Sequence, residues 1–214
     1  MQFDMGNAIG LPWLIFLAYW FLSARRVNRM ARREPVGSLL GRLALMCAAF
    51  YLLSGSDPRL GDLSARIFPP TYELFALGAA LTWLGIGFAI WARYHLGRFW
   101  SGTVALREGH QLIRSGPYAY IRHPIYTGML AAVLGTALAF DRYQGLVAFA
   151  LVLAGFAWKA SREEALLAGQ FGAEFEEHRQ HTGFFLPRFS CLGARELRFP
   201  FSIGFAGETG LMAS

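Results

Sequence analysis

Two segments that lie far apart in the chain hold the charged and aromatic residues best suited to chemistry. The first contains residues 110–118 followed by residues 122–126, which read Arg-His-Pro-Ile-Tyr, and the second, residues 159–164, ends in two adjacent glutamates. Adjacent carboxylates at the edge of an apolar run are costly unless they are paired or functional. Arginine, histidine and glutamate together can hold a charged ligand and move a proton. We expect these segments to build one site.

The residues around position 120 also predict local structure. Gly116-Pro117 is a strong turn signal, and Pro124 suits the first turn of a helix, where its missing N–H costs nothing. The free backbone N–H groups of a helix start favour an anion, so we expect Arg122 and His123 to lie at the mouth of a binding pocket. Flat aromatic faces for a ring or a cation are offered by Tyr118, Tyr120 and Tyr126.

Composition indicates that much of the protein surface faces lipid. Hydrophobic residues make up 55% of the 214 residues and charged residues 16%, whereas ordinary globular domains carry about 25% charged residues. Crossing a bilayer needs about 20 mostly apolar residues, within a range of roughly 17 to 25. We predict five spans, of which the second reaches full length from Val36 if the Arg42 side chain extends to the interface. The spans are Met5–Ala24, 43–56, 74–92, Pro124–Phe140 and 143–158. Because only residues 141–142 separate the last two, we predict that these two form a helical hairpin.

The charges between the spans predict an orientation. Arginines gather in residues 25–33, in residues 93–122 and after Trp158, whereas residues 55–73 and 141–142 carry nearly balanced charges. Because basic residues concentrate on the cytoplasmic side, we expect the N-terminus outside and the two chemistry-bearing segments in the cytoplasm. The same bias explains the net charge of +6, so we expect a lipid bilayer and no nucleic acid as the partner. We expect the setting to be a bacterial inner membrane.

Metal binding is not predicted. Cys47 lies in an apolar stretch and Cys191 in the C-terminal tail, so they form neither a disulfide framework nor a metal knuckle. The helical pattern of the fifth span continues to about residue 182. His178 and His181 lie three apart on this predicted helix, but no third ligand accompanies them. We therefore expect no metal.

Taken together, the motifs resemble the signature of the isoprenylcysteine carboxyl methyltransferases. The pattern is His110-x-Leu-Ile-x-x-Gly-Pro-Tyr118, then Arg122-His-Pro-x-Tyr126, then Glu163-Glu164 with Phe171-Gly172 eight residues on. The resemblance extends from about the third span to Pro187. The broader family includes relatives of the phospholipid N-methyltransferases.

The resemblance implies S-adenosylmethionine as methyl donor and S-adenosylhomocysteine as product. It places the cofactor in a cytoplasmic pocket formed by the loop before the fourth helix and the helical C-terminal segment, without a Gly-x-Gly-x-x-Gly motif. By the same resemblance, the cofactor-binding residues are His110, Gln111, Leu112, Ile113, Tyr118, His123, Pro124, Ile125, Tyr126 and Glu163.

Position 159 departs from the family pattern. Four residues before the cofactor glutamate, the prenylcysteine enzymes carry an arginine that meets the substrate carboxylate, whereas this chain has Lys159. Lysine keeps the charge but loses the planar two-pronged contact. We expect Lys159, with Arg162 on the same helix end, to guide an anionic acceptor, either lipophilic or small. We expect Arg122 and Glu164 to be catalytic by organising substrate and charge.

Two other classes of protein fit parts of the pattern. A membrane reductase of the sterol type would bind NADPH and would need a phosphate-binding basic cluster, for which Arg179 and Arg188 are candidates. A non-catalytic scaffold or transport component would bind no cofactor. In that case Arg122 would only mark the cytoplasmic edge of a span.

We therefore expect an all-α integral membrane protein with five transmembrane helices and one structural domain. Within it, residues 1–92 form three N-terminal helices, residues 93–189 form the catalytic core and residues 190–214 form a tail.

Overall fold

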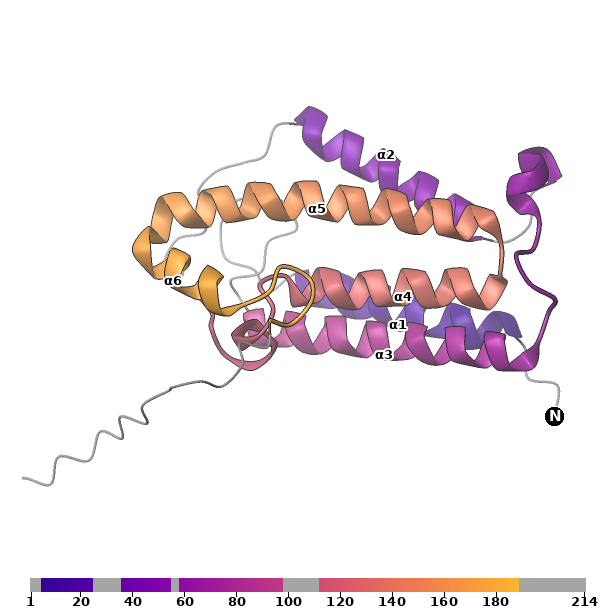
Figure 1. The fold of residues 1–214 in the computed structure, drawn as a ribbon, viewed down its shortest axis with the longest axis horizontal. Helices are drawn as coiled ribbons and strands as arrows, with labels where there is room; N and C mark the ends of the chain where they lie inside the picture. The colour runs from indigo at the N-terminus through magenta and orange to yellow at the C-terminus, as the bar shows by residue number, and fades with distance from the viewer. Residues whose placement is uncertain (1–4, 25–35, 55–57, 98–111, 189–214) are drawn as a thin grey trace, which may run out of the picture.

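The computed structural model describes residues 5–24, 36–54, 58–97 and 112–188, and over these residues the fold is all-helical (Figure 1). Long helices form at all five predicted positions. Two of them, α3 and α5, extend beyond the predicted ends. The elements are α1 (Met5–Ala24), α2 (Val36–Leu53), η1 (Pro58–Ser64), α3 (Tyr72–Leu96), η3 (Gly116–Ala119), α4 (Pro124–Phe140), α5 (Tyr143–Phe171) and α6 (Ala173–His181).

The helices are those of an integral membrane protein. By length and composition, three of them can cross a membrane, namely Gly6–Ser23 of α1, α3 and α5, whereas α4 and the apolar part of α2, Leu43–Leu53, are shorter. Large apolar side chains cover the outer faces of α1 and α3 and are largely exposed, as Leu14, Phe21 and Leu84 illustrate. An exposed apolar surface of this extent marks a lipid or protein contact.

Glycines bring α3 and α4 into close contact along their length. A Cβ atom on Gly85 would lie 2.5 Å from the backbone nitrogen of Ala132, and one on Gly128 would lie 2.6 Å from that of Ala89. Gly78 and Gly135 meet in the same way nearer the other end. Small residues allow such close packing of membrane helices. The helix pair fixes the start of α4, where the Arg-His-Pro motif lies.

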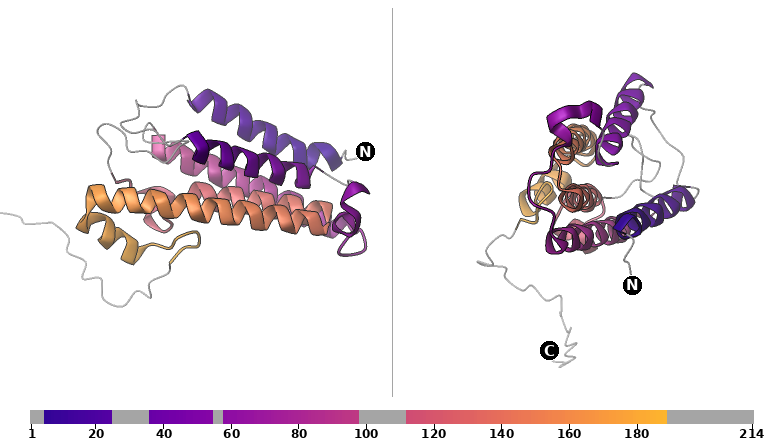
Figure 2. Two further views of the ribbon diagram at one scale, coloured as in Figure 1. Left: turned by 90° about the horizontal axis from the view of Figure 1, so that it is seen from above. Right: turned by 90° about the vertical axis from the view of Figure 1, so that its right-hand side faces the viewer.

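A proline in α1 determines how α1 packs against the other helices. Pro12 lacks an N–H and therefore leaves the carbonyl of Ala8 without its helical partner; the indole Nε1 of Trp83 in α3 donates to that carbonyl at 3.0 Å. One residue after the proline, Trp13 donates to the hydroxyl of Thr136 in α4, also at 3.0 Å. Figure 2 shows α1 beside α3 and α2 beside α5.

The predicted helical hairpin is confirmed at residues 141–142. Asp141 ends α4 in the left-handed conformation, with φ 52° and ψ 56°, which aspartate tolerates better than most residues. Its carboxylate accepts the backbone N–H of Phe68 at 3.1 Å, and this bond joins the hairpin tip to the segment before α3.

At the opposite end, α5 continues beyond its apolar part and then breaks. The predicted continuous helix to about residue 182 is wrong in this detail: Gly172 takes a φ of 51°, which ends α5, and α6 folds back toward the start of α4 (Figures 1 and 2). The fold thus brings α6 and the end of α5 to the residues that precede α4.

Candidate functional site

The segment before α4 is positioned by two backbone features. Gly116 has a φ of 58°, and a Cβ atom there would lie 2.4 Å from the ring of His95, so the predicted turn depends on glycine. Further on, the N–H of Arg122 donates to the carbonyl of Gly183 at 2.9 Å, and the N–H of Gly183 donates to the carbonyl of Tyr120 at 3.0 Å. The chain after α6 therefore pairs with the chain before α4.

Arg122, His123 and Glu164 form the first half of the site. The Nε of Arg122 lies 2.6 Å from Oε1 of Glu164, and Nε2 of His123 lies 3.1 Å from the same oxygen. All three side chains are mostly buried. The Arg122 guanidinium also donates through Nη1 to the carbonyls of Arg179, at 3.1 Å, and Thr182. One carboxylate oxygen thus serves both a fixed cation and an imidazole, an arrangement able to hold a proton.

Tyr126, Lys159 and Glu163 form the second half. The Tyr126 hydroxyl donates to both carboxylate oxygens of Glu163, at 2.8 and 2.9 Å. The ammonium of Lys159 donates to the Tyr126 oxygen at 2.7 Å and lies 3.2 Å from Oε1 of Glu163. The two halves meet at His123, whose Nδ1 lies 3.8 Å from Oε2 of Glu163.

Aromatic rings form the wall beside these charges. The Tyr126 ring stacks on His123 with centroids 5.6 Å apart and on Phe156 with centroids 4.8 Å apart. The ring of Phe184, from the segment after α6, packs edge to face against the ring of His123, with centroids 5.0 Å apart. The charged cluster is thereby shielded on the side of the bundle.

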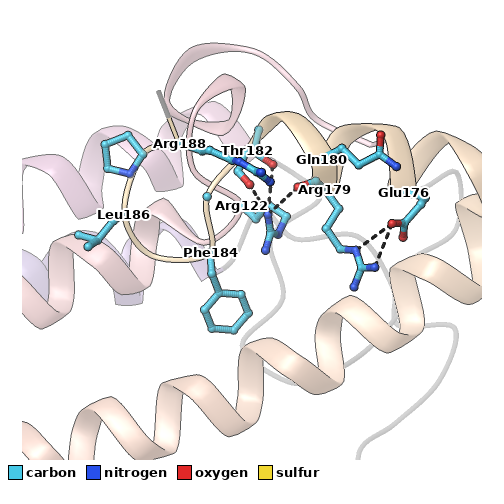
Figure 3. Close-up of a pocket in the computed structure, with 10 residues that line it drawn as sticks. Arg122, Glu176, Arg179, Gln180, Thr182, Phe184, Leu186 and Arg188 are labelled. Carbon is cyan, nitrogen blue, oxygen red and sulfur yellow. Dashed lines mark hydrogen bonds and ion pairs between the residues drawn. The ribbon is translucent and has the colours of Figure 1, made fainter. Parts of the chain in front are cut away.

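A cavity of about 560 Å³ opens beside Arg122 (Figure 3). Figure 3 shows the Arg122 guanidinium between the carbonyls of Thr182 and Arg179, while Arg179 itself reaches toward Glu176, 2.9 Å away. A volume of this size falls within the range of small-molecule sites, roughly 300–1,000 Å³. The cavity is lined by Arg122, Glu176, Arg179, Gln180, Thr182, Gly183, Phe184, Leu186, Pro187 and Arg188.

Two nearby titratable groups stay neutral. Burial raises the pKa of the Tyr118 phenol well above its ordinary value, and the charge of Glu163 acts in the same direction. Burial, followed by the charges of Arg114 and Arg122, lowers the pKa of His178 to about 4. Neither group therefore changes its charge near neutral pH. The groups left for ionic chemistry and proton transfer are Arg122, His123, Lys159 and the two glutamates.

The structure brings most of the predicted site residues together. Buried Pro124 and Ile125 begin α4, and half-buried Leu112 and Ile113 precede Arg114, which lies 3.2 Å from Glu177 of α6. His110 and Gln111 lie outside the described residues. Arg162 is not part of the cluster; it is exposed and lies over the ring of Trp158 at 5.1 Å.

The sequence-based prediction missed the residues that follow α6. Thr182 and Phe184 contact Arg122 and His123, and Gly183 is required because a Cβ atom there would overlap the carbonyl of Leu186. The available signal was the glycine at the end of a helical pattern, followed by two phenylalanines. Among the described residues, no group of three or more His, Cys, Asp or Glu side chains is arranged to hold a metal ion.

In comparison with known proteins, residues 74–174 of the chain match the family model described as phospholipid methyltransferase. The probable protein-S-isoprenylcysteine O-methyltransferase of Oryza sativa subsp. indica is 31% identical over 149 residues, which cover 65% of this chain and 78% of that protein. The protein-S-isoprenylcysteine O-methyltransferase of Schizosaccharomyces pombe is 33% identical over 147 residues, covering 64% of this chain but only 61% of that longer protein.

Among solved structures, the eukaryotic intramembrane Ras methyltransferase, an isoprenylcysteine carboxyl methyltransferase, matches with a TM-score of 0.49 and 21% identity. The match covers 73% of this chain and 54% of that one.

Proposed function

Because the chain belongs to the family of the protein-S-isoprenylcysteine O-methyltransferases, we propose that it transfers a methyl group from S-adenosylmethionine to a lipophilic acceptor at the membrane. The observation that carries the proposal is the cluster in which Arg122, His123 and Tyr126 meet Glu163 and Glu164. The Arg-His-Pro and Glu-Glu motifs, far apart in sequence, share one network of hydrogen bonds.

The donor set fits S-adenosylmethionine, which carries an ammonium, a sulfonium, a carboxylate and a flat adenine ring. Glu163 supplies a negative charge, and the stacked ring of Tyr126 supplies an aromatic face that also favours a cation. When bound, the cofactor supplies an electrophilic methyl group. We assign its binding to Glu163, Tyr118, Tyr126 and residues 110–113 and 123–125, of which 110 and 111 lie outside the described structure.

We assign catalysis to Arg122 and Glu164. Methyl transfer needs the attacking atom held about 3 to 3.5 Å from the methyl carbon and in line with the bond that breaks, so positioning is the main contribution of the protein. Arg122 is rigid because its Nε is paired with Glu164 and its Nη1 is held by backbone carbonyls. An acceptor carboxylate or thiolate needs no base. A thiol or an amine would give its proton to Glu164 or to Nε2 of His123.

We also propose the membrane arrangement. The 17 residues of α4 span about 25 Å, close to the thickness of a hydrocarbon core, and α2 has 18 residues, so five spans are compatible with the lengths. With five spans, the arginine-rich segments support an orientation in which the N-terminus is outside and the site is on the cytoplasmic side of a bacterial inner membrane. An acceptor with an apolar tail would then reach the site from the bilayer.

One observation favours a second candidate. The cavity beside Arg122 also contains Arg179 and Arg188, and such a basic cluster suits the phosphates of NADPH. A membrane reductase is therefore the alternative. The network around Glu163 favours the methyltransferase, since a cofactor with several phosphates gains nothing from adjacent carboxylates.

Calorimetric titration of the detergent-purified chain separates the two candidates. We expect S-adenosylhomocysteine to bind at one site, and the binding to be lost in Tyr126→Ala and Glu163→Ala, whereas NADPH gives no saturable heat. Binding of NADPH without binding of S-adenosylhomocysteine, by folded protein, would replace the methyltransferase proposal with the reductase.

A further inference from the structure

We infer that Lys159 is a positioning residue of the cofactor site, which acts through Tyr126 and Glu163 and does not contact the methyl acceptor. The inference rests on the proposed function and assigns to Lys159 a different task from the acceptor contact expected from its sequence position. Lys159 is the only lysine in the chain.

The Lys159 ammonium contacts Tyr126 and Glu163 inside the site. The residue is only 6% exposed, and its Nζ lies 2.7 Å from the Tyr126 oxygen, 3.2 Å from Oε1 of Glu163 and 5.0 Å from the centre of the Tyr126 ring. A buried charge is stable only when it is paired and hydrogen-bonded. The Tyr126 and Glu163 oxygens engage two of the three ammonium protons, and the burial of Lys159 leaves little access for an acceptor carboxylate.

The chemistry of the donors fixes the direction of the hydrogen bonds. An ammonium group has three protons and no acceptor, so the Tyr126 oxygen must accept from Lys159. The Tyr126 hydroxyl then donates its single proton to Glu163, whose two carboxylate oxygens lie 2.8 and 2.9 Å from the Tyr126 oxygen. Chains of hydrogen bonds in which each member polarises the next are stronger than isolated ones. Lys159 thereby locks both the hydroxyl and the carboxylate.

The identity of the residue suits this role. A lysine ammonium is a compact point charge on a flexible stem, whereas an arginine presents a wide planar fork suited to a carboxylate in the open. Here the charge sits one helical turn before Glu163 on the same helix, where the compact group fits beside the tyrosine hydroxyl. Arg162, the basic neighbour on this helix end, is exposed and turned toward Trp158.

The test is calorimetric titration with S-adenosylhomocysteine in the absence of any acceptor. A residue that contacts only the acceptor leaves this titration unchanged. We expect Lys159→Met to raise the Kd about tenfold or more, and Lys159→Arg, which keeps the charge on a wider group, to restore part of the loss. The control is Arg66→Met, which removes one exposed positive charge beside Arg142 at the hairpin tip and leaves the Kd unchanged.

A double-variant cycle shows whether Lys159 acts through the tyrosine. If it does, Lys159→Met raises the Kd by a smaller factor in a Tyr126→Phe background than in the wild type, because residues in one network are not additive. Additive losses, or a Kd for Lys159→Met and Lys159→Arg equal to that of the wild type, would overturn the inference. If Lys159→Met does not fold, Lys159→Gln, which removes the charge but keeps a polar side chain, takes its place in both Kd comparisons.

A spectroscopic readout uses the single lysine. Labelling with ¹⁵N-lysine gives one side-chain ammonium resonance, which we expect to shift on addition of S-adenosylhomocysteine and to change in Tyr126→Phe. A resonance that responds only to a prenylated acceptor contradicts the positioning role. If the wild type binds no S-adenosylhomocysteine at all, both the proposed function and this inference are wrong. If the wild type binds it and Lys159→Met binds it with the same Kd, only this inference is wrong.

Discussion

The Nε of Arg122, two residues before α4, lies 2.6 Å from Oε1 of Glu164 near the end of α5. This ion pair joins the two motifs that the sequence separates by most of a helical hairpin. Both side chains are nearly buried, at 12% and 15% exposed, so neither charge is well solvated without the other. The pair is therefore as much a structural bond between α4 and α5 as a part of the chemistry.

Removing one partner of this pair should cost more stability than removing both. We expect Arg122→Met to lower the free energy of unfolding by about 3 kcal/mol, because it leaves a mostly buried carboxylate with the His123 imidazole but without its arginine partner. Adding Glu164→Leu should recover part of that loss, while methyl transfer stays absent in both variants. Thermal unfolding in detergent measures the difference. A double variant that is less stable than Arg122→Met would show that the pair is not the structural bond we describe.

Tyr126→Phe should separate cofactor affinity from folding. The ring remains stacked between His123 and Phe156, so we expect an unfolding temperature within a few degrees of the wild type. The lost hydroxyl leaves Glu163 with Lys159 and the more distant His123 ring. We expect the Kd for S-adenosylhomocysteine to rise about tenfold, which corresponds to about 1.4 kcal/mol. An unchanged Kd measured by calorimetry would remove Tyr126 from the cofactor site.

His178 should make stability depend on pH. Its folded pKa of about 4 lies below the ordinary 6.5, so the unfolded chain takes up the proton first as the pH falls. The contribution to stability is fully present above pH 6.5 and is lost between pH 6.5 and 4. We expect unfolding temperatures between pH 7.5 and 5 to fall less steeply in His178→Asn than in the wild type. His181→Asn, an exposed neighbour on α6, should keep the wild-type slope; equal slopes in all three would contradict the assignment.

Alanine substitutions at two glycines of α3 should have opposite effects on stability. At Gly85 the new Cβ would lie 2.5 Å from backbone atoms of α4, and such overpacking costs about 1 to 3 kcal/mol. At Gly87 no atom lies within 4 Å, so alanine should stabilise the helix, by up to about 1 kcal/mol. Unfolding temperatures of Gly85→Ala and Gly87→Ala measure this directly. Equal effects would mean that α3 and α4 do not pack as described.

The helices and the two motifs were predictable from the sequence because their causes are local. Apolar runs of spanning length set the five long helices, and the two-residue join at Asp141 could only be a hairpin tip. The hairpin in turn predicted that Arg122 would lie near Glu164. Cofactor residues were predicted by resemblance, and their role in binding stays a prediction.

The other features of the fold and the site could not be predicted, because they depend on tertiary contacts. Nothing local showed that Gly172 takes a positive φ and turns α6 back, since a glycine within a helical pattern is often tolerated. The pairing of Gly183 with the segment before α4 joins residues far apart in sequence. The direction of the Lys159 ammonium, toward Tyr126, depends on how α5 is rotated against α4, which residue spacing on α5 alone does not determine.

The most direct test of the central claim is transfer of a labelled methyl group. The full chain in membranes is incubated with S-adenosylmethionine labelled on its methyl group and with N-acetyl-S-farnesylcysteine or membrane lipid extract as acceptor, beside Glu164→Gln. We predict label in the organic phase for the wild type and a decrease of at least a hundredfold in Glu164→Gln. Protein that binds S-adenosylhomocysteine but moves no label to either acceptor would contradict methyl transfer to a lipophilic acceptor.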